Sequence, residues 1–344
     1  MSDDVLADAV PVAVYHGVTR EQFRNEIMPR NQPALMKGLV NDWPAVKLAC
    51  QSDRAVMDYL RACDNGAGAP TMLGDPSIKG EFFYAESVTK RNFQTGLVSI
   101  SKALARLVDQ ARLDNPYAVY VQSAPVVEFL PRFRDENRLD FAQDGTEPRI
   151  WIGNQLRVQT HYDLSDNIAC CVAGKRRFVL FPPEQLANLY VGPFEHTLAG
   201  PPISMVLLEN PDFERYPRFR EALRHVQVAE LEPGDALYMP YFWWHNVRSL
   251  EPFNILINYW WNDTNTNGDP YNAMMHALLT LRDLPPKQRD PWRVMFDYYV
   301  FGSHGDPVAH LKPEERGTLA AMAPEMREQM QRQLARGLMK DWGG

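Results

Sequence analysis

The chain has 344 residues, 45% of them hydrophobic and 23% charged, with a formal net charge of -7 at pH 7. This composition allows one large or two ordinary domains with a proper core, and it excludes a disordered or fibrous chain. A net negative chain has no general basic field for nucleic acid, and its short basic runs, around Arg176 and Arg218, are typical of solvated faces. We therefore expect no nucleic-acid partner.

Cysteine usage and the first residues of the chain predict a cytoplasmic protein. The four cysteines form no C-x-x-C pair, which argues against a zinc ribbon or a thioredoxin-type site. Adjacent side chains on a strand point to opposite faces, so Cys170 and Cys171 are interpreted as small buried hydrophobic residues in a reducing compartment. Residues 1–11 lack the basic and apolar regions of a secretory signal, and no apolar stretch approaches the length of a membrane span.

Residues 1–116 mix helical and irregular patterns and are interpreted as an N-terminal α/β extension of the main domain. Residues 54–61 are predicted to form a helix that Asp53 caps. Residues 101–113 carry apolar side chains at helical spacing and predict a second helix.

Residues 117–262 are rich in short apolar or alternating runs, which predict strands. Turn residues such as Pro182-Pro183 and Pro233-Gly234-Asp235 separate the runs. The predicted strands are residues 118–122, 150–160, 167–173, 178–181, 203–208, 226–231, 236–239 and 253–261. About eight such strands fit a jelly roll or a related closed sandwich. The gaps are mostly too short for the helices of a parallel doubly wound sheet. The predicted fold is therefore mainly β with flanking helices.

Residues 263–344 return to helical patterns. The candidates are residues 271–281, 292–300 and 321–338. In the last of these, Met326, Met330, Leu334 and Leu338 recur every fourth residue and form an apolar stripe. Two interpretations remain open for this stripe: it packs against the barrel, or it is the face of a homodimer.

Two side chains that can bind metal, His161 and Asp163, are spaced two residues apart. On a strand or at its end they lie on one face. A third ligand from a neighbouring strand would complete a set of two imidazoles and one carboxylate, the pattern that points to non-haem Fe(II). His304 and Asp306 repeat the motif, but they lie in a stretch of glycine and proline between predicted helices. We therefore favour the first pair.

The predicted third ligand is His245. It follows the Pro233-Gly234-Asp235 turn and stands next to Trp243 and Trp244, in an aromatic setting that contains little water. A lone histidine among aromatic residues is often a packed core residue instead. His196, in a loop flanked by glycine and proline, is the weaker rival.

Other catalytic devices find no support in the sequence. There is no G-x-S-x-G elbow, no P-loop and no G-x-G-x-x-G motif after a strand. No cysteine stands beside an obvious basic partner that would favour a thiolate. The histidine and aspartate residues are therefore the main candidates for chemistry.

The motifs around these residues resemble those of the JmjC-type cupin oxygenases, the cupin-like group related to factor inhibiting HIF. They are Thr160-His161-Tyr162-Asp163, the run from Gly174 to Pro183, and the run from Pro233 to His245. The N-terminal segment, residues 15–46, is also similar to the segment that usually begins the domain in this family. The motifs occur in the right order over about residues 12–262. The resemblance implies a double-stranded β-helix, Fe(II), and 2-oxoglutarate as co-substrate.

Carried over by position, the resemblance also implies roles for single residues. His161, Asp163 and His245 match the metal ligands. Tyr120 and Asn167 match positions that line the 2-oxoglutarate pocket. Asn258 matches a residue close to both the metal and the co-substrate.

One position departs from the family pattern. The family usually has a lysine two residues after the strand-end glycine, where it pairs with the distal carboxylate of 2-oxoglutarate; here Arg176 holds that position. Lys175 cannot replace it without a register shift, because adjacent side chains on a strand face opposite ways. Arginine can bind a carboxylate through two parallel hydrogen bonds, but it is longer and planar, so the pocket is reshaped or the co-substrate differs. Val158 is a second departure, where a hydroxyl-bearing residue is found in a relative.

These observations predict an Fe(II)- and 2-oxoglutarate-dependent hydroxylase that uses dioxygen and releases succinate and CO2. Its substrate would be a protein or peptide side chain or a small metabolite. We expect an aromatic wall that keeps water away from the metal, formed by Tyr238, Trp243, Trp244, Trp260 and Trp261. Two alternatives remain: a catalytically silent cupin that binds a metal or ligand, and a cupin enzyme that uses another metal without 2-oxoglutarate. The intact triad opposes the silent cupin, and the change at Arg176 mildly favours it.

Overall fold

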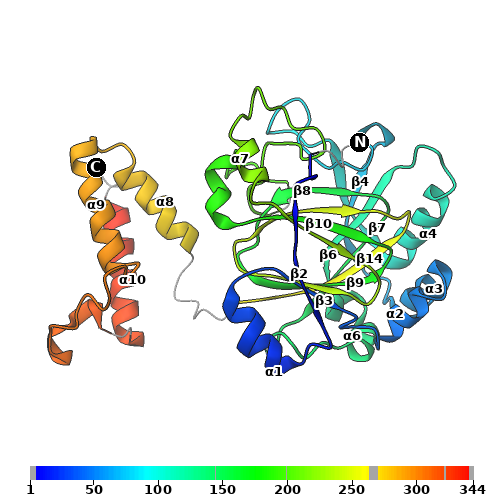
Figure 1. Cartoon of the computed structure of the whole chain (residues 1–344), viewed down its shortest axis with the longest axis horizontal. Helices are drawn as coiled ribbons and strands as arrows, with labels where there is room; N and C mark the ends of the chain where they lie inside the picture. Colours follow the sequence, from blue (N-terminus) through cyan, green and yellow to red (C-terminus); the bar gives the residue numbers. More distant parts are fainter. Residues whose placement is uncertain (1–4, 144, 199, 263–269, 321–322, 341–344) are drawn as a thin grey trace. The chain divides into compact units, whose positions relative to one another are not determined.

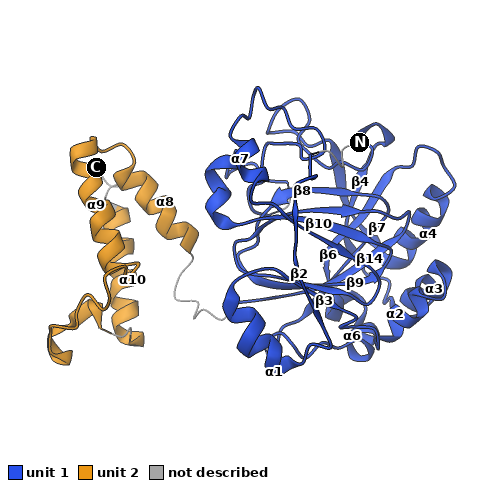
Figure 2. Cartoon of the chain, viewed as in Figure 1, with its two compact units in different colours: residues 1–263 blue, residues 264–344 orange. Residues whose placement is uncertain are grey.

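The computed structural model describes residues 5–143, 145–198, 200–262, 270–320 and 323–340. The chain forms two compact units, Met1–Asp263 and Thr264–Gly344 (Figure 2). The regions 1–116 and 117–262 share the first unit, because N-terminal strands join the sheets of the central region.

The first unit is built on two sheets (Figure 1). The smaller sheet has the order β1-β11-β10-β13-β8, with β1 (Val10–Pro11), β8 (Arg157–His161), β10 (Arg176–Phe181), β11 (Gln227–Leu231) and β13 (Trp244–Ser249). The larger sheet has the order β2-β3-β12-β9-β14-β7-β6-β4-β5. Its strands are β2 (Ala13–His16), β3 (Ala34–Lys37), β4 (Gly68–Gly74), β5 (Phe93–Ser99), β6 (Ala118–Pro125), β7 (Pro148–Gly153), β9 (Asp166–Ala173), β12 (Ala236–Met239) and β14 (Asn254–Trp261).

The strands from β7 to β14 cross between the two sheets as the chain advances. The larger sheet takes β7, β9, β12 and β14, and the smaller sheet takes β8, β10, β11 and β13. Each of these strands pairs antiparallel with its neighbours from this set. This is the arrangement of a double-stranded β-helix, so the predicted jelly-roll core is confirmed.

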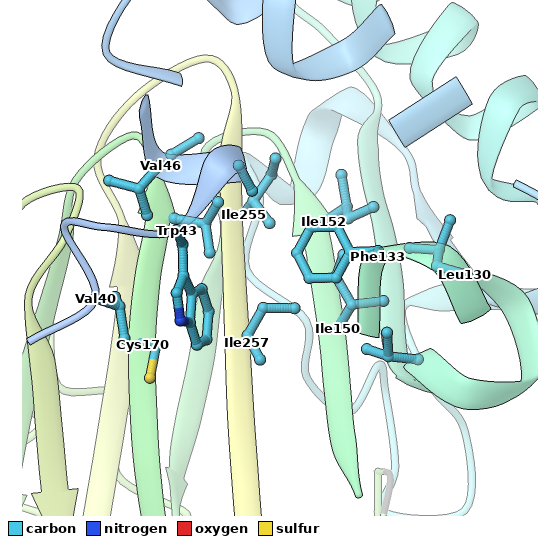
Figure 3. Packing of buried hydrophobic residues seen from close by; sticks show 14 of the residues in the cluster. Val40, Trp43, Val46, Leu130, Phe133, Ile150, Ile152, Cys170, Ile255 and Ile257 are labelled. Atoms are coloured by element: carbon cyan, nitrogen blue, oxygen red, sulfur yellow. The ribbon is translucent and has the colours of Figure 1, made fainter. Parts of the chain in front are cut away.

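Short helices cover the outer face of the larger sheet. They are α1 (Arg20–Gln22) with the π-helical turn Phe23–Ile27 and the 3-10 turn Met28–Arg30, α2 (Pro44–Ala49), α3 (Asp53–Cys63), α4 (Ile100–Gln110), α5 (Val126–Phe129) and α6 (Pro131–Glu136). Figure 3 shows the contact between these layers, with Val46 and Phe133 facing Ile152 and Ile255 of the sheet. On the outer face of the smaller sheet, α7 (Phe219–Leu223) packs through Phe219. Two further 3-10 turns are Pro76–Ile78 and Pro183–Asn188.

The two faces of β9 belong to different cores. Cys170 lies in the cluster between the larger sheet and the helices, whereas Cys171 lies in the cluster between the two sheets. Both side chains are fully buried and free. The alternation predicted for this pair of cysteines is therefore confirmed, since side chains on a strand alternate between its two faces.

The turn Pro233-Gly234-Asp235 ties the start of β12 to the end of β3. The carboxylate of Asp235 is buried and accepts hydrogen bonds from the Gly38 and Glu232 amides at 3.0 and 2.9 Å. Lys37 donates a third, at 2.5 Å. Gly234 has a φ of +98°, and a Cβ there would collide with the side chain of Asn41, so this position requires glycine.

Several predicted elements differ from those observed. Residues 150–160 form two strands, β7 and β8, separated by a turn, and residues 203–208 form only isolated bridges at Ile203 and Ser204. The sequence does not predict strand β13 (Trp244–Ser249), because the segment is recognised only as an aromatic run with a single histidine. The helix cap is Ser52 and not Asp53: its side chain accepts from the Ala55 amide at 3.1 Å.

The second unit is helical, as the sequence predicts. It contains α8 (Pro270–Leu281), α9 (Pro286–Tyr299), the 3-10 turns Pro313–Glu315 and Gly317–Leu319, and α10 (Pro324–Lys340). Residues 321 and 322, included in the third predicted helix, lie outside the described residues. On α10, Leu334 and Leu338 are 56% and 42% exposed. Among the described residues, no helix is both long and apolar enough to cross a membrane.

Candidate metal centre

The three predicted metal ligands come together at one end of the barrel. His161 is the last residue of β8, Asp163 follows two residues later, and His245 is the second residue of β13, directly opposite His161 in the strand pairing. Their ligand atoms all lie within 4.8 Å of one another, and His245 Nε2 is 3.6 Å from Asp163 Oδ2. Within the described parts of the chain, this is the one group of three such side chains.

Both imidazoles are oriented by backbone carbonyl groups two residues upstream. His161 Nδ1 lies 2.7 Å from the Gln159 oxygen, and His245 Nδ1 lies 3.0 Å from the Trp243 oxygen. A carbonyl oxygen only accepts, so each Nδ1 carries the proton and each Nε2 keeps its lone pair for a metal. Burial, and then the neighbouring His161, lower the pKa of His245 to about 4. The imidazole of His245 is therefore neutral at physiological pH, as a metal ligand must be.

A chain of amides and indoles holds the third ligand. Asp163 Oδ2 accepts from Trp260 Nε1 at 3.0 Å and from Asn167 Nδ2 at 3.2 Å. Asn258 Nδ2 reaches the Asn167 side-chain oxygen at 3.4 Å, and Trp151 Nε1 donates to the Asn258 side-chain oxygen at 2.7 Å. Such partners orient a metal-binding carboxylate. Asn167, predicted to lie near the co-substrate, thus contacts the candidate metal ligand Asp163, and Asn258 contacts Asn167.

Arg176, the first residue of β10, and Lys175, directly before it, point in opposite directions. Lys175 is exposed and pairs with Glu232 at 2.7 Å. Arg176 is 1% exposed, and its Nε and Nη2 atoms have no hydrogen-bond partner in the described parts of the chain. It lies beside Tyr120, whose pKa is raised to about 12 by burial against the opposing effect of the guanidinium. A buried cation with unsatisfied donors is costly, so this position is suited to an anion.

The rival histidines lie elsewhere. His304 is in an exposed turn, and Asp306 Oδ1 accepts from the Val308 amide at 3.0 Å, so this second motif is a capped loop as predicted. His196 is exposed, and its backbone oxygen accepts a hydrogen bond from Tyr84.

A cavity of about 400 Å³ opens at the metal centre. Its wall includes His161, Asp163, Tyr120 and Val158. The expected wall of aromatic residues is only partly correct, because of the five residues named for it Trp260 alone lines the cavity. The other four are buried in the cores on either side of the sheets; they are Tyr238, Trp243, Trp244 and Trp261.

The residues of the cavity wall that sequence reasoning missed include Arg149 and Trp151. Both lie on β7, two residues apart, and therefore on the same face. The alternation of side chains within residues 148–153 could have indicated that these two residues share a face, but it does not tell which face borders the cavity.

Comparison with known proteins agrees with this fold. Residues 20–267 match the family model of the cupin-like domain, and the chain belongs to that family. It is 28% identical to the tRNA wybutosine-synthesizing protein 5 of Gallus gallus, over 82% of this chain and 92% of that protein. It is 29% identical to the HSPB1-associated protein 1 of Rattus norvegicus, over 70% of this chain, and 30% identical to that of Homo sapiens. The matched region spans about half the length of those two proteins.

The donor set fits a divalent transition metal. Two neutral imidazoles and one carboxylate, with an open cavity beside them, suit Fe(II) and leave positions free for other ligands. The Nε and Nη2 atoms of Arg176 have no hydrogen-bond partner among the described residues, and they fit a carboxylate beside Tyr120, a residue of the cavity wall.

Proposed function

We propose that this protein is an Fe(II)- and 2-oxoglutarate-dependent oxygenase that hydroxylates a protein side chain or a small metabolite. The proposal rests on one observation: the same barrel contains both a candidate metal site and a candidate anion site. Three preoriented ligands lie together, two of them, His161 and Asp163, in the cavity wall, and a buried arginine with unsatisfied donors lies beside Tyr120.

In this proposal each residue has a separate task. His161, Asp163 and His245 hold the metal, while Arg176 pairs with the distal carboxylate of 2-oxoglutarate. When bound, the metal and co-substrate supply the oxidation of a substrate C–H group by dioxygen, with succinate and CO2 as co-products. Asn167 and Trp260 keep Asp163 oriented, and the apolar wall of the cavity limits the access of water.

The relatives support the family and do not choose a substrate. By their names, one relative takes part in tRNA wybutosine synthesis and another associates with HSPB1. The net charge of -7 favours a protein or a small metabolite over a nucleic acid for this chain.

The test is succinate release from 2-oxoglutarate by the Fe(II) protein, measured with and without candidate substrates. Succinate above the metal-free control supports the oxygenase. A protein that binds metal but neither binds nor consumes 2-oxoglutarate would instead be a silent cupin or an enzyme of another type. Mass spectrometry of a host lysate, searched for a gain of one oxygen atom, then identifies the substrate.

A further inference from the structure

One arginine of the cavity wall has no role in the proposed function. Arg149 is the one lysine or arginine among the described residues that line the cavity, and it is half-buried. No carboxylate of the described chain lies within ion-pair distance of it, whereas Arg134 on the adjoining surface pairs with Glu147 at 2.5 Å. Its charge is therefore available to a ligand in the cavity.

The guanidinium of Arg149 is fixed in place. Its Nη1 atom donates to the Ser123 carbonyl oxygen at 2.8 Å and to the Ser123 hydroxyl at 3.2 Å. Its Cζ atom lies 5.8 Å from the centre of the Trp260 ring. These contacts involve the Nη1 atom and one face of the guanidinium. Among the described residues, the Nε and Nη2 donors have no hydrogen-bond partner. An arginine held in this way loses little side-chain entropy when it binds an anion.

The backbone that holds Arg149 is itself irregular. The pairing of β6 with β7 shifts between Val121 and Ala124, and Ser123 within this bulge has a φ of +49°. A residue other than glycine in the left-handed region is uncommon, and such positions cluster at functional sites. The bulge places Gln122 and Ser123 in the cavity wall, next to Arg149.

Arg149 is separate from the place proposed for 2-oxoglutarate. A row of three aromatic rings lies between the two arginines: Tyr120 beside Arg176, then Trp151 at 5.8 Å, then Trp260 at a further 5.8 Å, next to Arg149. Trp260 also donates to the metal ligand Asp163. Arg149 thus stands on the metal side of the row, and Arg176 stands at its other end.

We infer that Arg149 binds an anionic group, a carboxylate or a phosphate, of the molecule to be oxidised. This inference rests on the proposed function, because it assigns the substrate class of the same cavity. Arg149 would then be a specificity-determining residue: it holds the substrate by its charge beside the metal, while Trp260 and the apolar wall contact the rest. Neutral analogues of the substrate would bind weakly.

The experiment uses benzoate and phenyl phosphate as anionic probes and benzamide as the neutral control. Each is titrated calorimetrically into the full-length Fe(II) protein, under anaerobic conditions with saturating 2-oxoglutarate, so that Arg176 is occupied and no turnover takes place. We expect at least one anion to bind about tenfold or more tightly than benzamide, in the range of a charge-assisted hydrogen bond. The stronger anion distinguishes a carboxylate site from a phosphate site.

Variants identify the residue responsible. Arg149→Met should abolish the preference for the anion, and Arg149→Lys should keep part of it. Arg177→Met is the matched control, because Arg177 lies on the outer side of β10 and pairs with Glu230 at 2.7 Å. The charge-transfer absorption of the metal-bound 2-oxoglutarate should be the same in all four proteins, which shows that the variants are folded.

An absence of anion preference in the wild type, or its persistence in Arg149→Met, overturns the inference. Failure of the proposed function gives a different result. In that case the charge-transfer absorption is absent from the wild type, whatever the anion titration shows.

Discussion

His161 and His245 lie directly opposite each other on the antiparallel strands β8 and β13, with ring centroids 4.3 Å apart. The next ladder pair, Val247 with Val158, follows a shift in register, so a bulge separates the histidine pair from the regular part of the ladder. A slip of one residue would turn an imidazole to the other face. The register of these two strands therefore determines whether the site exists.

The first prediction concerns the metal ligands. Alanine at His161, Asp163 or His245 should each strongly weaken Fe(II) binding, because each removes one of three protein ligands. His304→Ala and Asp306→Ala should leave it unchanged. Anaerobic calorimetry with Fe(II) measures both sets. Loss of metal from the His304 variant, with retention in the His161 variant, would mean that the site has been assigned to the wrong histidine.

The second prediction concerns the residue behind Asp163. Trp260→Phe keeps an aromatic ring but removes the indole N–H that donates to Asp163. Loss of such a partner typically costs about 10–100-fold in metal affinity. Trp243→Phe, whose indole donates to the Asn31 oxygen away from the metal, is the control and should not change the affinity. Equal metal affinity in both variants would show that Trp260 does not position the ligand.

The third prediction tests the buried arginine. Leaving one charge of a buried pair without its partner typically costs roughly 3–5 kcal/mol, so Arg176→Ala should weaken 2-oxoglutarate by about two to four powers of ten. Arg176→Lys should retain part of the affinity. Lys175→Ala should have little effect, because Lys175 faces solvent and pairs with Glu232.

Anaerobic titration of the Fe(II) protein, followed by charge-transfer absorption, gives these affinities. The assignment fails if Lys175→Ala is the variant that abolishes the absorption, or if the wild type shows none.

The fourth prediction concerns stability. Asp235→Ala removes a buried carboxylate with three hydrogen-bond donors, one of them the charged Lys37, and should lower the free energy of unfolding by roughly 3–5 kcal/mol. Glu232→Ala removes only an exposed ion pair and should cost no more than about 1 kcal/mol. Urea unfolding measures both. Equal losses in the two variants would contradict a special role for Asp235.

The fifth prediction concerns assembly. The apolar side chains of Leu334 and Leu338 are exposed on α10, and covering them in a second copy would remove this apolar surface from water. We expect the full chain to be a homodimer and a chain without residues 324–344 to be a monomer. Sedimentation at micromolar concentration distinguishes the two. Leu334→Asp should give a monomer like the deletion, whereas the control Gln333→Asp should leave the dimer intact. A full-length chain that sediments as a monomer would contradict the prediction.

The sequence by itself was enough to choose the candidate metal ligands, which the structure brings together, and the class of fold. Side-chain alternation on a strand places His161 and Asp163 on one face, separates Cys170 from Cys171, and turns Arg176 inward when Lys175 faces out. Each of these follows from a period of two residues, which is a local property of the chain. Turn residues separated the strands well enough to indicate a jelly roll.

The tertiary structure alone decided which residues share the cavity. Trp260 lines it, whereas Trp243 and Trp244 are buried in other clusters, and Arg149 meets Ser123 across two strands. The run at residues 203–208 remains isolated bridges, and the unpredicted β13 supplies His245. Periodicity gives the face of a strand but not its neighbours. Those depend on pairing between residues far apart in the chain, such as His161 with His245, which only the folded sheets bring together.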